Sequence, residues 1–443
     1  MKKQKPIITA IICELNPMHT GHTYLIEQAK KQTNATYMVG IMSGNFSQRS
    51  EPCILNKYLR AKIAIDNGFD LMLNLPTAFC TNNAEVFALS AIKILNNLKT
   101  VNYLAFGVET LNEKAFYTLS NFMHSEPEEF KNLLKQNLKS GLSHNKAYIK
   151  TLKEKRDFFD KSLQDDIIKI LDRPNNVLAL EYIKALIKTN SKIKPIFIYR
   201  KNDYNSINIE NNFTSATSLR NKIFENKLCE IKKFLPQNSV KFFEENLQKN
   251  NAKNFEKSEQ YFNQKIDNNS IEILTKNFNK NYQIPLNFKM LILYKIKSSN
   301  LSYLKSIYGV CEGLENKLKN LSQTTNSFDE FYTSLQTKRY KQNKINSIIL
   351  NVLLDIDKKT IAKLYTIKNN IFVKILAINP KKHDILGKIN TKNLILRKLD
   401  ADKKTFDNFN KKLFEIENNA NIVYNLIYNT HLYENDLYNK MES

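Results

Sequence analysis

The 443-residue chain has little glycine and cysteine, with nine and five residues respectively, and no tryptophan. The cysteines are widely spread and none forms a C-x-x-C pair. That pattern argues against a disulfide framework or a structural zinc site and indicates a reducing compartment. No run of about 18 apolar residues occurs, so the sequence excludes a membrane-spanning helix.

Acidic residues are few beside basic ones. The chain has 43 Asp and Glu against 67 Lys and Arg, a net charge of +24. A broad positive field favours a polyanionic partner such as nucleic acid. The alternative is a proteome rich in Lys and Asn that tolerates the excess charge.

The N-terminus has some features of a secretory signal peptide. Three lysines within Met1–Lys5 are followed by the apolar run Ile7–Cys13. That run is at the lower limit for such a peptide, and Glu14 follows at once. A buried first strand explains the run better, and we expect a cytoplasmic protein.

Short apolar runs alternate with helix-length segments in the first half of the chain. Continuous runs of this kind are typical of strands buried on both faces of a parallel sheet, and the alternation predicts an α/β fold with βαβ units. The predicted strands are Ile7–Cys13, Thr36–Met42, Asp70–Leu75, Val101–Phe106 and Pro195–Arg200.

The second half has a different texture, with Lys, Asn, Leu and Ile at helical spacing. We therefore predict two units, 1–225 and 226–443, the second mainly helical and basic. A helical insertion at about 112–190 is expected in the first unit. Two runs in the second, Ile371–Ile378 and Asn393–Leu399, are compatible with extended structure.

The sharpest motif lies between the first strand and the first helix, and reads Glu14-Leu15-Asn16-Pro17-Met18-His19-Thr20-Gly21-His22. Two of the six histidines of the chain fall here. Gly21 lets the backbone approach a ligand, and the amides at the start of a helix favour a phosphate. Two imidazoles at that point can stabilise charge that develops during transfer of a nucleotide.

Two other interpretations of the motif remain open. The H-x-x-H spacing could bind a metal ion, although no acidic or cysteine partner lies nearby apart from Glu14 and Cys13 at the strand end. Both histidines could also be structural turn residues.

The H-x-G-H element resembles the signature of the HIGH superfamily, which includes nucleotidyltransferases and class I aminoacyl-tRNA synthetases. The superfamily's second signature is a Ser/Thr-rich segment ending in a basic residue, and Thr214–Arg220 is similar to it. The resemblance implies a Rossmann-like sheet at which the α-phosphate of a nucleotide is attacked. A helix cap with an exposed Arg220 is the alternative for the second segment.

The resemblance is closer to the bacterial tRNA(Met) cytidine acetate ligases. It runs in order through Glu14–Pro17, Met42–Arg49, Glu51-Pro52, Phe106-Gly107, Arg173–Asn176, Ser215–Arg220 and Thr337–Tyr340. Three residues depart from the family pattern: Leu15 replaces Tyr, Met18 replaces Phe, and Ser50 replaces Gly.

The resemblance implies a reaction in two steps. ATP and acetate give acetyl-adenylate, and the acetyl group then passes to the wobble cytidine of elongator tRNA(Met), forming 4-acetylcytidine. ATP is then a substrate, and Mg²⁺ is expected to bind with it. The expected partners are tRNA and acetate, and no stable protein partner is expected. Two alternatives are a nucleotidyltransferase acting on a small phosphorylated metabolite and a non-catalytic RNA-binding protein.

The resemblance also implies site residues. His19 and His22 are the expected catalytic pair. The expected ATP-binding residues are Ile12, Cys13, Glu14, Leu15, Asn16, Pro17, Met18, His19, Thr20, Gly21, His22, Thr23, Tyr24, Leu25, Gly107, Asn175, Arg200, Ser215, Thr217 and Ser218. Simpler roles stay open for three of them: a turn glycine at Gly107, an N-cap at Asn175 and an exposed strand-end side chain at Arg200.

Basic side chains provide weaker candidates. Arg49, Lys57 and Arg60 could face the triphosphate or the tRNA, or line a solvated helix face. In the second half, Lys338, Arg339, Tyr340 and Lys341 combine charge with an aromatic ring and are candidates for tRNA binding. Surface lysines on an amphipathic helix are the alternative.

Overall fold

The computed structural model describes residues 5–142, 144–200, 215–225, 227–248, 285–311, 313–337, 340–368, 370–390, 392–395 and 406–428. At its centre is one sheet with the strand order β5-β4-β1-β2-β3-β6-β7. Its strands are β1 (Ile8–Cys13), β2 (Tyr37–Ser43), β3 (Leu71–Leu75), β4 (Val101–Val108), β5 (Lys194–Tyr199), β6 (Val373–Ile378) and β7 (Leu394–Ile395).

The first five strands are parallel to one another. They coincide, within a few residues, with the five strands predicted from the apolar runs, and the predicted α/β fold is confirmed. The runs are continuous because the sheet is buried on both faces. Ile8, Ala10 and Ile12 of β1 belong to one apolar core, whereas Ile11 and Cys13 belong to the other.

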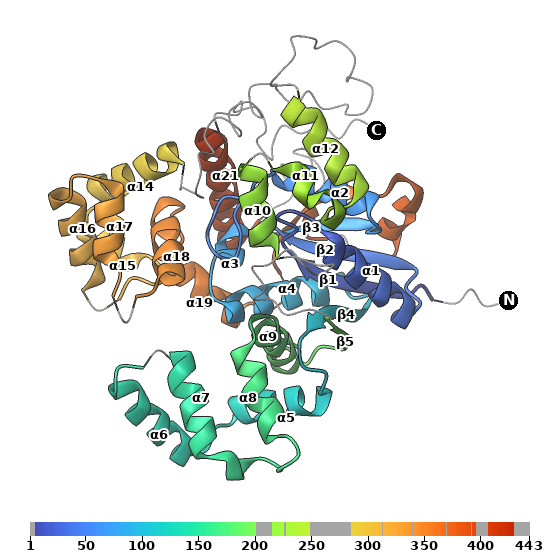
Figure 1. Cartoon of the computed structure of the whole chain (residues 1–443), viewed down its shortest axis with the longest axis horizontal. Coiled ribbons are helices and arrows are strands. Elements are labelled where there is room, and N and C mark those ends of the chain that lie inside the picture. Colours follow the sequence, from blue (N-terminus) through green and yellow to red (C-terminus); the bar gives the residue numbers. More distant parts are fainter. Residues whose placement is uncertain are drawn as a thin grey trace.

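Helices connect the parallel strands and cover the sheet (Figure 1). They are α1 (Thr20–Thr33), α2 (Lys57–Asp66), α3 (Thr77–Cys80) and α4 (Ala84–Leu98). Asn side chains cap several of them: Asn56 accepts a hydrogen bond from the Leu59 amide at the start of α2, and Asn83 accepts one from Val86 at the start of α4.

A helical lobe stands between β4 and β5, where the sequence predicts an insertion (Figure 1). It contains α5 (Glu113–His124), α6 (Glu128–Lys139), α7 (His144–Glu154) and α8 (Gln164–Asp172), and α9 (Pro174–Lys188) returns the chain to the sheet. Phe122 packs among Phe130, Phe158 and Phe159 at ring distances of 4.8–5.7 Å, and this aromatic group is continuous with the main apolar core.

The described residues after β5 are mainly helical, as expected. The helices are α10 (Ala216–Phe224), α11 (Leu228–Ile231), α12 (Gln237–Gln248), α14 (Leu286–Ser298), α15 (Leu301–Ser306), α16 (Leu314–Thr324), α17 (Phe328–Leu335), α18 (Gln342–Leu353), α19 (Lys358–Thr366) and α21 (Asn408–Tyr428).

Two strands of the second half, β6 and β7, join the sheet. The extended structure expected at 371–378 is strand β6, which pairs antiparallel with β3, and β7 continues the sheet from there. Helix α21 packs against α3 and α14. The sheet and its main apolar core therefore take residues from both sides of position 225. A division into units at 225 stays a prediction, and the two units share this core.

Among the helices that the structure describes, none combines the length and apolar character required to cross a bilayer.

Candidate active site

The two motif histidines form the start of helix α1. His19 is the N-cap, and its Nδ1 accepts a hydrogen bond from the Gly21 amide at 3.1 Å. The Nδ1 of His22 accepts one in return from the His19 amide at 3.2 Å. Each ring thus uses Nδ1 as an acceptor, so the hydrogen of each neutral imidazole is assigned to Nε2. The pair presents two Nε2–H donors beside the positive end of a helix.

Both imidazoles are neutral at pH 7. Burial, followed by the proximity of the other ring and of Arg200, holds the pKa of His19 well below its usual 6.5. Burial and the Arg200 guanidinium lower the pKa of His22 to about 3. The ring centroids lie 3.9 Å apart. A neutral donor that is already in place can stabilise negative charge without reorganising.

Gly107, Asn175 and Arg200 meet beside this pair, although the sequence separates them widely. A Cβ at Gly107 would lie 3.0 Å from Cδ and 3.1 Å from Cγ of Arg200, so the missing side chain makes room for the arginine. Arg200 donates from Nη1 to Oδ1 of Asn175 at 3.3 Å. Gly107 lies within strand β4 and not in a turn, and Arg200 is partly buried and not an exposed strand end. Contact of either residue with a nucleotide stays a prediction.

Asn175 does not cap helix α9, because the N-cap is Arg173. Its Nδ2 donates to Oε1 of Glu109 at 2.7 Å, which fixes the amide that meets Arg200. The neighbouring Asn176 is buried and accepts from the Glu109 amide at 2.7 Å. Sequence reasoning missed Glu109 and Asn176, and the Asn-Asn pair at the helix start was the available signal.

The second signature meets the first in space. Ser215 caps α10, and its Oγ accepts from the Ser218 amide at 3.1 Å. Arg220 is 9% exposed, donates to the Asn16 carbonyl at 2.9 Å and contacts Thr217 Oγ1 at 3.2 Å. The alternative of an exposed Arg220 is thus wrong, because the side chain is largely buried and binds the motif loop. Thr214 lies outside the described residues.

Most other side chains of the first motif face the protein. Ile12, Cys13, Leu15 and Met18 are buried in the apolar cores. Burial raises the pKa of the Cys13 thiol to about 12, so it stays protonated.

The polar groups of the motif hold loops in place. Glu14 Oε1 accepts from the Gln48 amide, and Asn16 Oδ1 from the Ile54 amide at 2.9 Å. A nucleotide at this loop would meet mainly backbone. The expected ATP-binding strip, residues 12–25, runs through Pro17 into the first turns of α1. Its remaining members there are Thr20, Gly21, Thr23, Tyr24 and Leu25. ATP binding by the residues of this strip stays a prediction.

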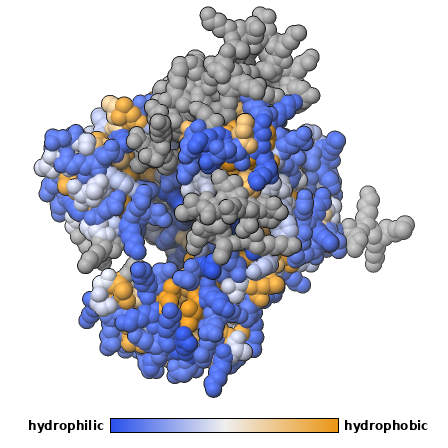
Figure 2. All heavy atoms as spheres, in the orientation of Figure 1, coloured by the Kyte–Doolittle hydropathy of each residue, from blue (hydrophilic) through white to orange (hydrophobic). Residues whose placement is uncertain are grey.

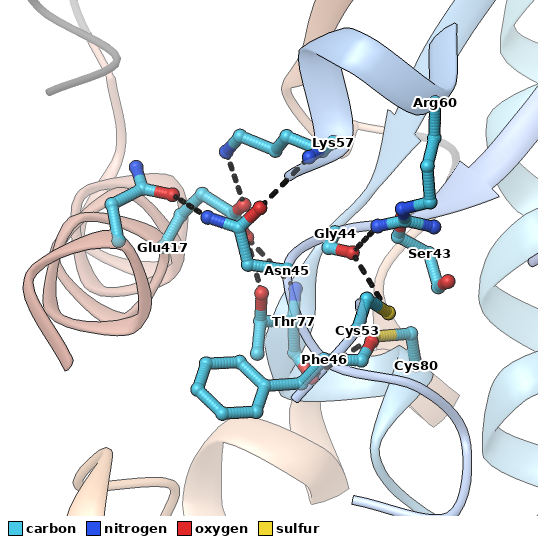
Figure 3. Close-up of polar contacts among 11 residues, drawn as sticks. Ser43, Gly44, Asn45, Phe46, Cys53, Lys57, Arg60, Thr77, Cys80 and Glu417 are labelled. Atoms are coloured by element: carbon cyan, nitrogen blue, oxygen red, sulfur yellow. Dashed lines mark hydrogen bonds and ion pairs between the residues drawn. The ribbon is translucent and has the colours of Figure 1, made fainter. Parts of the chain in front are cut away.

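Lys57 and Arg60 are not on a solvated face. Lys57 is 0% and Arg60 1% exposed, because both lie on the side of α2 that packs inward. Arg60 donates to the carbonyls of Leu55, Glu14, Ser43 and Gly44. Figure 3 shows its contact with the Gly44 carbonyl. Its guanidinium is therefore used within the protein, where it ties together the ends of β1 and β2, and the expectation that it faces a triphosphate or tRNA is wrong.

Two non-glycine residues near the site have left-handed backbones. Ser50 has φ +61°, and Leu15 has φ +52°. Glycine adopts this conformation without strain, so the serine at position 50 carries a backbone cost that a glycine would not. Here the Ser50 Oγ donates to the Thr81 carbonyl at 2.8 Å and helps to hold the turn.

The basic cluster of the second half is only partly described. Lys338 and Arg339 lie outside the described residues. Tyr340 contacts Cys311, with 3.3 Å between the hydroxyl and Sγ, and Lys341 is the exposed N-cap of α18. A role of this cluster in tRNA binding stays a prediction.

Within the described ranges, no three or more His, Cys, Asp and Glu side chains come together in a group that could hold a metal ion.

Comparison with known proteins gives consistent results. The model of the HIGH Nucleotidyl Transferase family matches residues 7–439. A tRNA(Met) cytidine acetate ligase of Thermoanaerobacter sp. (strain X514) is 34% identical over 427 residues, 95% of each chain. One of Acetivibrio thermocellus is 31% identical over 426 residues, again 95% of each.

The fold has a solved counterpart. Thermotoga maritima TmcAL bound with alpha-thio ATP superposes with a TM-score of 0.78 at 24% identity, over 95% of each chain. The family model spans nearly the whole sequence, and the relatives exceed 30% identity over nearly all of it. The chain belongs to the HIGH nucleotidyl transferase family and, within it, to the tRNA(Met) cytidine acetate ligases.

Proposed function

We propose that this protein is an ATP-dependent ligase that activates acetate and transfers the acetyl group to the wobble cytidine of elongator tRNA(Met), forming 4-acetylcytidine. The observation that carries the proposal is the pair of neutral imidazoles, each with Nε2–H available as a donor at the N-terminus of α1. The names of the relatives point to the same reaction.

In the first step, an acetate oxygen attacks the α-phosphorus of ATP and the bond to the β-phosphate oxygen breaks. The products are acetyl-adenylate and pyrophosphate. Negative charge grows on the α-phosphate oxygens and on the leaving group. Donors at His19 and His22 would stabilise that charge, and the helix N-terminus would add to the effect.

In the second step, the exocyclic amine of the cytidine attacks the acetyl carbon. AMP leaves, and the amine loses one proton as the amide forms. Attack requires the two reacting atoms about 3–3.5 Å apart. The wobble base lies in a single-stranded anticodon loop, where a protein can reach its edges.

The remaining site residues have proposed roles as well. Gly107, Asn175 and Arg200 would hold the nucleoside or the α-phosphate, and Ser215, Thr217 and Ser218 would lie along the triphosphate at the start of α10. Mg²⁺ would be held mainly by the phosphates, because the described residues provide no ligand cluster for it. Lys338, Arg339, Tyr340 and Lys341 remain the proposed contacts to tRNA.

A component-omission experiment tests the proposal. We expect ATP–pyrophosphate exchange that requires acetate but no tRNA, and incorporation of labelled acetate into tRNA(Met) that requires all three substrates. A tRNA(Met) with uridine at the wobble position lacks the amine and is the matched control. Exchange that depends on a phosphorylated metabolite instead would favour a metabolite nucleotidyltransferase. RNA binding without any exchange would favour a non-catalytic protein.

A further inference from the structure

The segment 44–56, between β2 and α2, contacts the histidine motif on one side. The Gln48 amide donates to Glu14, and the Ile54 amide donates to Asn16 Oδ1 at 2.9 Å. Because Glu14 and Asn16 precede His19 by only a few residues, a shift of this segment changes the loop that delivers the histidines to the start of α1.

On its other side, the same segment contacts helix α21, more than 350 residues further along the chain. Asn45 donates to Asn421 Oδ1 at 3.1 Å, and the Tyr424 hydroxyl donates to the Cys53 carbonyl at 2.9 Å. The rings of Phe46 and Tyr424 pack edge to face at 6.3 Å. The segment is therefore held between the motif loop and α21.

A buried ion pair lies at the centre of this contact (Figure 3). Lys57 Nζ and Glu417 Oε1 are 2.8 Å apart, and their side chains are 0% and 2% exposed. The second oxygen of Glu417 accepts from the Thr77 amide at 2.9 Å and from the Thr77 hydroxyl at 2.8 Å. The Lys57 amide donates to Asn45 Oδ1 at 2.9 Å. Such a pair has a narrow range of acceptable positions, because each charge loses its oppositely charged partner if α2 and α21 shift apart.

Helix α2 carries this constraint toward the motif. Arg60 follows Lys57 by three residues, on the same face of the helix. Its guanidinium donates to the carbonyls of Glu14, Ser43 and Gly44. A single helix turn thus connects the carboxylate of α21 to the end of β1, where the motif begins.

We propose that Glu417 is a positioning residue for the activation of acetate. Through Lys57, α2 and the segment 44–56, it sets the place of residues 14–19 and hence of the two Nε2–H donors. Glu417 touches no reacting atom itself. The kinetic test of this inference rests on the proposed function. The inference gives helix α21 a part in the first step, which uses only ATP and acetate.

The variant for the test is Lys57→Met combined with Glu417→Gln. It removes both charges together and leaves an amide oxygen to accept from Thr77. Glu417→Ala alone would leave Lys57 buried without its carboxylate and could unfold the protein. The control is Lys289→Met with Asp329→Asn, which makes the same removal of one positive and one negative charge at a more exposed ion pair of 2.7 Å between α14 and α17.

In acetate-dependent ATP–pyrophosphate exchange, we expect the paired variant to lose about 100-fold in kcat, since misplaced catalytic groups cost that much. The KM for ATP should rise by a smaller factor than kcat falls, because the histidine donors act in the transition state and the proposed contacts at Gly107, Asn175 and Arg200 lie outside residues 14–19. The control variant should keep the kcat of the wild type. A paired variant with wild-type kcat and only a lower Tm would overturn the proposal.

Hydrogen exchange gives a readout that does not depend on activity. We expect the amides of residues 14–25 to exchange faster in the paired variant than in the control, since the loop loses its support. If the wild type shows no acetate-dependent ATP–pyrophosphate exchange, the proposed function fails. The hydrogen-exchange rates of these amides then test the positioning role without any activity. Equal rates for residues 14–25 in the paired variant and the control would overturn it.

Discussion

Arg220 donates from Nη1 to the backbone carbonyl of Asn16 at 2.9 Å and thereby joins two segments that are 204 residues apart. The same guanidinium contacts Thr217 Oγ1 at 3.2 Å and lies 3.9 Å from a Glu51 oxygen. The two signatures of the sequence are thus parts of one loop cluster, fastened by a largely buried arginine.

Replacement of this arginine by lysine tests the link. Arg220→Lys keeps the positive charge but cannot reach the carbonyl and the hydroxyl with one planar group. We expect acetate-dependent exchange to fall about tenfold, equivalent to about 1.4 kcal/mol, the size of one hydrogen bond from a charged group. The exposed substitution Arg156→Lys serves as the control. Equal loss in both variants would contradict the link.

Substitution of each motif histidine by asparagine tests whether the pair is catalytic. Asn at position 19 still caps α1, so His19→Asn removes the Nε2–H donor without removing the cap. We expect His19→Asn and His22→Asn each to lower the kcat of exchange by about 10²–10³, or about 2.7–4 kcal/mol, the usual loss of one such donor. The exposed His383→Asn should be silent. If either motif variant turned over as fast as the wild type, that histidine would have no catalytic role.

The histidines also predict how stability depends on pH. Their folded-state pKa values lie below the ordinary 6.5, at about 3 for His22. The unfolded chain therefore binds more protons below pH 6.5, so the pair lowers the free energy of unfolding as the pH falls from 7 toward 3. We expect urea midpoints to drop between pH 7 and pH 5, and to drop less in His19→Asn/His22→Asn. An equal drop would show that the histidines are not held neutral.

Gly107→Ala tests the space beside Arg200. The new Cβ would lie 3.0 Å from Arg200 Cδ, so the arginine must move and weaken its contact with Asn175. We expect the KM for ATP to rise about fivefold, for a loss of about 1 kcal/mol. Gly387→Ala is the control, because a Cβ there meets nothing within 4 Å. An unchanged KM in Gly107→Ala would remove this glycine from the nucleotide site.

A chain that ends at residue 225 is expected not to fold. It lacks β6, so the edge of β3 would be exposed, and it leaves Lys57 buried without Glu417. Losing one partner of a buried pair costs about 3–5 kcal/mol, which is a large share of the stability of a domain. Circular dichroism and a urea titration measure the outcome. A cooperative fragment that still binds ATP would show that the first unit is independent.

The amino-acid sequence alone determines the elements of this protein. Apolar runs such as Ile7–Cys13 predict the parallel strands because both faces of the sheet are buried. The stripe Ile345, Ile348, Ile349, Val352 and Leu353 predicts α18. The pairing of His19 with His22 follows from their spacing at a helix start. All of these signals act within about 20 residues, which a local pattern can record.

The tertiary structure decides which of the charged side chains become internal. Lys57 and Arg60 are residue types typical of a solvated helix face, yet both are buried. Their burial is tolerable only because Glu417 and several backbone carbonyls satisfy them. Those partners come from other elements of the chain, Glu417 from 360 residues away. The free energy of a buried charge depends on its partners in space, and no spacing within α2 could have predicted them.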